Sequence, residues 1–217
     1  MTHSLIAQCT YDEIQVALFQ DDTLQSSFSE SKKTASKQLL SSLQTLLENK
    51  KLSLDDISFI GINQGPAPFT TLRVLITTIN GLAFANKIPL VGLNGLESML
   101  KEYSAPEHPT LCLYNAFNKD AYFGIQAPNV HTTGCLPIDK VLTQVKEQFS
   151  SQPIHVIGHG AEFFKQELFD TFGKELILTQ PIAEYPTPVF LHKQAETLFN
   201  AGQIQNQVQP LYLKKAV

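Results

Sequence analysis

The residues of this chain that could do chemistry are few and lie far apart in the sequence. The segment 65–71, G-P-A-P-F-T-T, follows a short apolar run and precedes a helical pattern, where phosphate-binding loops occur. It lacks the Gly-Lys-Ser/Thr of a P-loop and the three glycines of a dinucleotide-binding loop. Pro66 and Pro68 end the preceding strand, because neither can donate to a ladder. A rigid strand-to-helix turn is the favoured interpretation, and a phosphate loop is the minor alternative.

Histidines and cysteines do not form a recognisable site. His155 and His159 lie four apart in a strand-like segment, and so on one face. A zinc site needs three or four ligands, and no third ligand is near in sequence. The three cysteines, Cys9, Cys112 and Cys135, are odd in number and widely separated, which argues against a disulfide framework and fits a reducing cytoplasm. No G-x-S-x-G motif supports a serine hydrolase.

Composition indicates a globular protein that is not a strong nucleic-acid binder by itself. The chain has 217 residues, of which 43% are hydrophobic and 17% charged, and its formal net charge is −4. Its basic pairs are scattered rather than gathered in a stripe. No secretory signal opens the sequence, and no apolar run approaches the ~20 residues of a membrane span. We therefore expect a cytoplasmic protein without a membrane partner.

The helical pattern from Phe69 to Asn86 is the element around which the chain is organised. Arg73 is its only charge, and it is apolar over most of its circumference. Such a helix is buried on two sides, so it is either the centre of a core or the carrier of a partner. One stripe comprises Phe69, Leu72, Ile76, Ile79 and Ala83, and a second comprises Val74, Leu75, Leu82 and Ala85.

The remaining elements follow one order twice, on either side of a proline-rich segment at 105–109. That order is three strands, a helix, a strand, a helix and a strand, which predicts α/β lobes at 1–104 and 105–217 with mixed sheets covered by helices. The last helix is a candidate for packing back on the first lobe. Strands are predicted at 5–9, 14–19, 24–28, 57–62, 90–93, 111–115, 122–127, 130–135, 154–157 and 176–178, and helices at 36–49, 69–86, 95–103, 138–149, 161–169 and 190–201.

Five short motifs carry a resemblance that spans nearly the whole chain. They are G-P-A-P-F-T-T-L-R at 65–73, L-V-G-L-N-G-L-E at 90–97, Y-N-A-F-N-K-D-A-Y at 114–122, G-H-G-A at 158–161 and P-L-Y-L-K at 210–214. The first resembles the G-P-G-S-F-T-G-L-R signature of the bacterial TsaB (YeaZ) family, and the others resemble later runs of that family in the same order. The duplicated plan is similar to that of the actin, sugar-kinase and Hsp70 superfamily.

This resemblance implies both a fold and a function. The fold would be a duplicated actin-like (ASKHA, RNase H-like) arrangement of two lobes. The function would be that of a non-catalytic partner of TsaD, the sister protein that holds the metal and active site, in threonylcarbamoylation of the adenosine beside the anticodon of tRNA. The implied partners are TsaD, TsaE and a second copy of the chain through the same helical face, with tRNA approached only through the complex.

The superfamily's enzymes place a carboxylate at the end of the first strand of each lobe, where it organises Mg²⁺. Here these positions hold Cys9 and Asn115, a soft thiol and a neutral amide, which are poor ligands for a hard cation. We therefore expect no catalytic, cofactor-binding or metal-binding residue. The alternatives from other classes are a small ATP-dependent kinase or ATPase of the same superfamily and a free-standing metallohydrolase.

A partner-binding face is expected on the outward-facing sides of the helices at 36–49 and 69–86. The inner face of the first carries Leu39, Leu40, Leu43, Leu46 and Leu47. Its outer face offers uncharged polar groups, which cost less to remove from water than charged ones. Two such helices can dock against two from a related molecule as a four-helix bundle. The resemblance implies that TsaD binds there. The residues expected at this joint are Ser41, Thr45, Thr71, Leu75, Thr78 and Leu82, and an exchange of the two stripes remains open.

Overall fold

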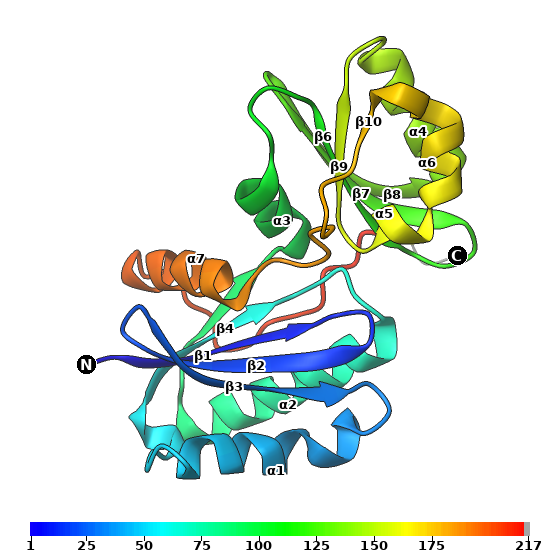
Figure 1. Ribbon diagram of the computed structural model, residues 1–217. Helices are drawn as coiled ribbons and strands as arrows, with labels where there is room; N and C mark the ends of the chain where they lie inside the picture. The colour runs from blue at the N-terminus through cyan, green and yellow to red at the C-terminus, as the bar shows by residue number, and fades with distance from the viewer. Residues whose placement is uncertain (215–217) are drawn as a thin grey trace. The chain divides into compact units, whose positions relative to one another are not determined.

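The computed structural model describes residues 1–214, which form two compact units, each built on a five-stranded sheet (Figure 1). The first unit comprises Met1–Asn94 and Thr187–Leu211. The second comprises Gly95–Pro186 and the described residues from Tyr212 onward. The sequence placed a single boundary after residue 104, with 215–217 in the second lobe. The structure groups the helix at 95–103 with the second unit and the last helix with the first, and 215–217 lie outside the described residues.

The first unit is a mixed sheet with helices on both faces (Figure 1). Its strands have the order β3-β2-β1-β4-β5, in which β1 pairs antiparallel with β2 and parallel with β4. This architecture confirms the α/β class of an actin-like lobe. The elements are β1 (His3–Cys9), β2 (Glu13–Gln20), β3 (Thr23–Ser31), α1 (Ala35–Glu48), η1 (Leu54–Asp56), β4 (Ile57–Asn63), α2 (Phe69–Asn86), β5 (Leu90–Leu93) and α7 (Pro188–Asn200).

Alternation along the strands explains why both faces of this sheet are covered. In β1, Leu5 joins the core beneath α1 and α2, whereas the next residue, Ile6, joins a second core beneath α7. Phe19 belongs to the α7 side as well. Helix α7 approaches β4 so closely that a Cβ atom at Gly61 would lie 2.7 Å from the Cβ atom of Ala195. Glycine is therefore required where this helix crosses the sheet.

The second unit repeats the plan with the strand order β10-β9-β6-β7-β8. One face packs on α4 and α6, and the other on α3. The helix predicted at 161–169 is two short helices that meet at Phe164. The elements are α3 (Gly95–Tyr103), β6 (Thr110–Asn115), β7 (Asp120–Ala127), β8 (Val130–Pro137), α4 (Ile138–Gln148), β9 (Ile154–Ile157), α5 (Gly160–Phe163), α6 (Lys165–Phe172), η2 (Gly173–Glu175) and β10 (Leu176–Ile177).

After α7 the chain returns across the first unit and is fixed there by hydrogen bonds. Gln205 and Leu90 exchange backbone bonds of 3.0 and 2.8 Å. The side chain of Asn80 in α2 accepts from the N–H of Val208 at 3.0 Å and donates to its carbonyl at 2.9 Å. The Val208 side chain is only 1% exposed. The late segment is therefore an integral part of the first unit.

Candidate partner-binding surface

Helix α2 is set in place by its ends and by one buried side. It starts after Pro68 and stops at Lys87, whose left-handed backbone (φ 56°) lets its N–H reach the carbonyl of Ala83. The side that faces the sheet is closely packed. Its buried residues are Thr71, Leu72, Leu75, Ile76, Ile79 and Ala83.

The opposite side of α2 presents large apolar groups to solvent. Phe69 is 55% exposed and Phe84 is 85% exposed. The helix's only charge, Arg73, lies over the Phe69 ring with its guanidinium carbon 3.7 Å from the ring centroid. This cation–π contact covers one face of the Phe69 ring, whereas Phe84 remains largely exposed to solvent.

Helix α1 runs beside α2 and adds an apolar side chain among uncharged polar ones. Leu40 is 56% exposed, although the sequence placed it with the core leucines of this helix. The hydroxyl of Ser41 donates to the carbonyl of Gln38 at 2.8 Å, and that of Thr45 donates to the carbonyl of Ser41 at 2.9 Å. Because both hydroxyls are already bonded within the helix, covering them costs less free energy than covering groups that depend on water.

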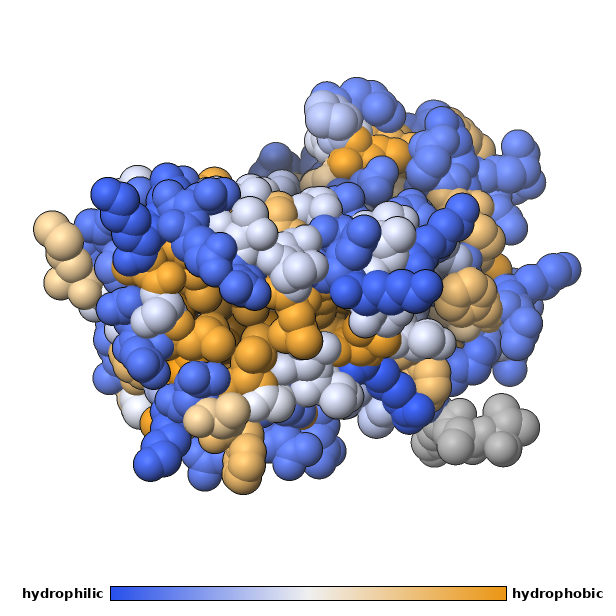
Figure 2. All heavy atoms as spheres, turned by 90° about the horizontal axis from the view of Figure 1, so that it is seen from below, coloured by the Kyte–Doolittle hydropathy of each residue, from blue (hydrophilic) through white to orange (hydrophobic). Residues whose placement is uncertain are grey.

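Two shallow hollows mark this surface, which we call the α1/α2 face (Leu40, Phe69, Phe84 and the hollows beside them). Each has a volume of about 480 Å³. Figure 2, which views the molecule from the side of α1 and α2, shows apolar atoms gathered in a band across this face with a hydrophilic rim. One hollow is lined by Leu40, Leu43, Gln44, Leu47, Glu48, Leu52, Ser53, Leu54 and Leu82, and the other by Ser36, Phe69, Thr70, Arg73, Val74, Thr77 and Thr78.

Four of the six residues expected at a joint lie on or beside this face. Ser41 and Thr45 are exposed on α1. Thr78 and Leu82 are partly exposed on α2, where each lines one of the two hollows. The structure therefore brings these four side chains to one side of the unit.

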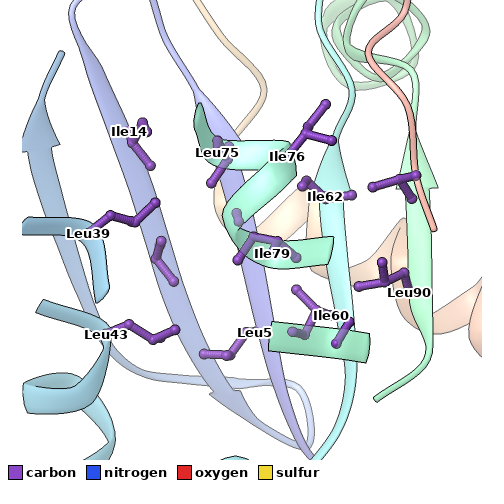
Figure 3. Packing of buried hydrophobic residues seen from close by; sticks show 14 of the residues in the cluster. Leu5, Ile14, Leu39, Leu43, Ile60, Ile62, Leu75, Ile76, Ile79 and Leu90 are labelled. Carbon is purple, nitrogen blue, oxygen red and sulfur yellow. The ribbon is translucent and has the colours of Figure 1, made fainter. Parts of the chain in front are cut away.

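The prediction is wrong for Leu75 and Thr71. Leu75 has no exposed area and points among Ile14, Leu39 and Ile79 in the core, as Figure 3 shows. Thr71 is 9% exposed and faces inward as well. The predicted second stripe lies partly inside and partly outside the buried side of α2 (the buried arc), because both α1 and the sheet cover this helix. Leu75 is inside that arc and Ala85 is outside it.

Sequence reasoning missed the most exposed apolar residues of the face, Leu40, Phe69 and Phe84. Phe69 was placed in the first apolar stripe because it begins a regular apolar spacing, and Leu40 was grouped with the other leucines of its helix. Phe84 belonged to neither stripe. The sequence did offer one signal of an exposed apolar surface. Phe84 is a large aromatic residue outside both apolar stripes of a helix that has only one charge.

The ends of β1 and β6, where a magnesium enzyme of this fold was expected to need carboxylates, carry uncharged, internally bonded groups. Cys9 ends β1, its thiol donates to the carbonyl of Thr10 at 3.2 Å, and burial raises its pKa to about 12. Asn115 ends β6, and its side-chain oxygen accepts from the N–H of Phe117 at 2.8 Å. Neither group offers the anionic oxygen that a hard cation prefers.

The turn that follows β4 is a compact backbone structure. The Asn63 side chain accepts from the N–H of Gly65 at 2.9 Å, and Gly65 has a φ of 102°. A Cβ atom at that position would lie 2.9 Å from a methyl carbon of Leu72. Both its backbone conformation and its packing therefore require glycine. These contacts support the rigid-turn interpretation of this segment.

His155 and His159 do not share a strand face. β9 ends at Ile157, and His159 lies beyond it at the N-terminus of α5, where its Nδ1 is 3.6 Å from a Glu184 oxygen. His155 is 8% exposed, and neither of its ring nitrogens has a hydrogen-bond partner among the described residues. The expectation of two histidines on one strand face was wrong, because Gly158 (φ 89°) turns the chain between them.

Comparison with known families places most of the chain within one of them. The family model for TsaD, tRNA N6-adenosine threonylcarbamoyltransferase, matches residues 27–185. The tRNA threonylcarbamoyladenosine biosynthesis protein TsaB of Bacillus subtilis is 25% identical over 211 residues, covering 93% of this chain and 89% of that protein. The Escherichia coli TsaB protein is 31% identical over 84 residues, 39% of this chain and 36% of its own.

Solved structures with the same fold give a consistent result. YeaZ from Pseudomonas aeruginosa superposes with a TM-score of 0.70 at 20% identity, covering 98% of this chain and all of the other. A protein of actin-like ATPase fold from Bacteroides thetaiotaomicron superposes with a TM-score of 0.54 at 10% identity, covering 88% of this chain and 96% of the other. At these identities the likeness concerns the fold.

Proposed function

Because the chain belongs to the family of the TsaD model and is similar to the TsaB proteins of tRNA threonylcarbamoyladenosine biosynthesis, we propose that it is the non-catalytic partner of TsaD. In this proposal TsaD carries out threonylcarbamoylation of the adenosine beside the anticodon. The present chain binds TsaD through the α1/α2 face. It approaches tRNA only as part of the complex, with TsaE as a further component.

The observation that supports this proposal most directly is the exposed apolar surface on α1 and α2. Three large side chains, Leu40, Phe69 and Phe84, are each more than half exposed on neighbouring helices. Surfaces that expose several large apolar side chains, with a band of apolar atoms between polar rims, mark interaction sites in soluble proteins (Figure 2). The patch lies on paired helices, which suits docking against a related pair in a protein of the same fold. TsaD belongs to the family whose model this chain matches.

The residues at the strand ends support a non-catalytic role. Cys9 is a buried thiol with a raised pKa, and Asn115 is an amide engaged with the backbone. Asp12, the nearest carboxylate after β1, is exposed and pairs with Lys32 at 2.8 Å. A magnesium-dependent phosphoryl transfer site would have to be built without a carboxylate at either position.

The alternative function is a small ATP-dependent kinase or ATPase of the actin-like superfamily, supported only by the fold. Under our proposal the purified chain alone shows no magnesium-dependent ATP turnover. Asn115→Asp alone restores none, because the other strand end still lacks its carboxylate. Steady turnover by the unmodified chain that EDTA abolishes would favour the ATPase instead.

Partner binding is tested by placing a charge on the α1/α2 face. Phe84→Arg and Leu40→Arg should each weaken binding of TsaD by 100-fold or more, since an unpaired charge buried at an interface costs about 3–5 kcal/mol. Titration calorimetry with purified TsaD measures this loss. The same variants should remove any self-association seen by sedimentation, because we propose that a second copy uses the same face when TsaD is absent.

Phe163→Arg is the matched control, since Phe163 is 56% exposed on the second unit, far from α1 and α2 in the chain. It should leave TsaD affinity unchanged. Unaltered far-UV circular dichroism and thermal melting show that all three variants fold. Retention of tight TsaD binding in folded Phe84→Arg and Leu40→Arg would place the interface elsewhere.

A further inference from the structure

Three potential metal ligands meet on the first unit, on the side of the sheet opposite α1 and α2. Asp22 lies in the turn between β2 and β3, and His192 and Glu196 lie on α7 one helical turn apart. One ligand atom from each residue lies within 4.8 Å of the other two. None of the three residues belongs to the α1/α2 face or to the strand ends discussed above.

The imidazole of His192 is held in a fixed orientation at this place. The residue is 2% exposed, and its ring stacks on Phe19 with centroids 4.2 Å apart and planes at 14°. A second aromatic ring, that of Phe59, lies 6.3 Å away. Within residues 1–214 the imidazole has no hydrogen bond or ion pair. Unlike those of His155, the ring nitrogens of His192 are not among the fully buried unpaired atoms of the described residues, so they remain accessible to an ion.

Two carboxylates lie next to this ring. Asp22 is exposed, Glu196 is half-buried, and a carboxylate oxygen of one lies within 4.8 Å of a carboxylate oxygen of the other. The adjacent Asp21 adds a third negative group, although its carboxylate accepts a bond from the N–H of Thr2 at 2.9 Å. Like charges at this spacing repel, and a bound cation would neutralise them.

We propose that Asp22, His192 and Glu196 bind a first-row divalent ion, for which Zn²⁺ is the best fit. One imidazole nitrogen and two carboxylate oxygens suit zinc, whereas Mg²⁺ and Ca²⁺ prefer oxygen ligands alone. Ligands at ~2.1 Å from zinc lie nearer one another than 4.8 Å, so the site must contract slightly on binding. Asp22 can supply this movement, because it is an exposed residue in a turn.

The arrangement predicts what the ion does. Three protein ligands leave the fourth position of a tetrahedral ion for water or a partner's side chain. Two ligands come from α7 and one from the β2–β3 turn, so the ion joins the last helix to the first hairpin. The ion's role is to stabilise the packing of α7 on this face of the sheet. This inference is independent of TsaD binding.

The test is calorimetric titration of the full-length, metal-free chain with ZnCl₂, repeated with CoCl₂, whose visible spectrum reports its ligand geometry. We expect one equivalent to bind and a tetrahedral cobalt spectrum to appear. Asp22→Asn and Glu196→Gln, which remove one ligand charge with little change in size, should each weaken zinc binding at least tenfold. Glu97→Gln is the matched control, because Glu97 pairs with His131 at 2.9 Å but belongs to no three-ligand cluster within residues 1–214. It should leave zinc affinity unchanged.

A final variant separates ligation from packing. His192→Phe keeps an aromatic ring against Phe19 and should abolish the cobalt spectrum while the metal-free protein remains folded. If that variant fails to fold, the two carboxylate variants decide the question alone. Absence of binding at ~100 µM zinc, or binding that Glu97→Gln weakens and Glu196→Gln does not, would overturn the proposal.

Discussion

At the scale of single residues, this protein holds several polar groups in surroundings that keep them uncharged. Burial raises the pKa of the Cys9 thiol to about 12 and raises that of Cys112 as well. Burial also lowers the pKa of His155, with His108 acting in the same direction and Glu107 opposing it. The native state therefore favours a neutral imidazole at position 155, which makes its stability sensitive to acid.

The first prediction concerns that sensitivity. In the unfolded chain His155 has an ordinary pKa of about 6.5, whereas its pKa in the folded protein is lower. Between these two values the unfolded chain binds more protons, so the free energy of unfolding falls as the pH drops below about 6.5. His155→Leu should reduce this loss. Urea unfolding at pH 7.5 and pH 5 measures it for both proteins.

The acid sensitivity should become smaller in His155→Leu without disappearing, because burial also lowers the pKa of His192 in both proteins. A stability loss between the two pH values that is the same in His155→Leu and the unmodified chain would show that the position 155 imidazole does not contribute.

At the scale of elements, most helix and strand bounds could be predicted, because local chemistry sets them. The structure places α2, β5, α3 and β9 at the predicted bounds. Pro68 precedes the first of these and Pro89 follows it closely, and regular apolar spacing fills its interior. The break at Phe164 was missed, since the apolar spacing continues through it. Which arc of α2 is buried was missed too, because α1 and the sheet decide it rather than α2 itself.

The second prediction separates the two sides of α2. Leu75→Ala creates a cavity at a fully buried position and should lower the free energy of unfolding by about 2–5 kcal/mol. Phe84→Ala removes a side chain that is 85% exposed and should change it by less than about 0.5 kcal/mol. Denaturant unfolding of each variant measures both. A nearly neutral Leu75→Ala would mean that Leu75 is not a core residue.

At the scale of the whole molecule, charge and composition were informative about function where the motifs were imperfect. The net charge of −4 and the 43% hydrophobic content are those of a globular protein without a strong electrostatic attraction to phosphate. No helix within residues 1–214 has the length and apolar character that a membrane crossing requires. The pairing of Asp22 with His192 could not be predicted, because nearly the whole chain lies between them.

The third prediction follows from this net charge. The chain by itself should bind tRNA weakly, with an affinity that changes little with salt compared with the steep dependence of a protein making about 6–10 phosphate contacts. Fluorescence anisotropy with labelled tRNA at several salt concentrations measures this. Submicromolar binding by the isolated chain at physiological salt would mean that it carries a tRNA site of its own.

The return of the chain to the first unit has a consequence for biosynthesis. Strands β1 to β5 leave the ribosome early, and their α1/α2 side can be buried at once. The other side, with Ile6, Phe19 and Phe59, is covered only by α7, which is translated after residues 95–186 of the second unit. Val208, which completes the packing of the first core, follows later still. The nascent first unit therefore exposes an apolar sheet face until α7 has been synthesised, and such a surface is prone to aggregation and is one that chaperones protect.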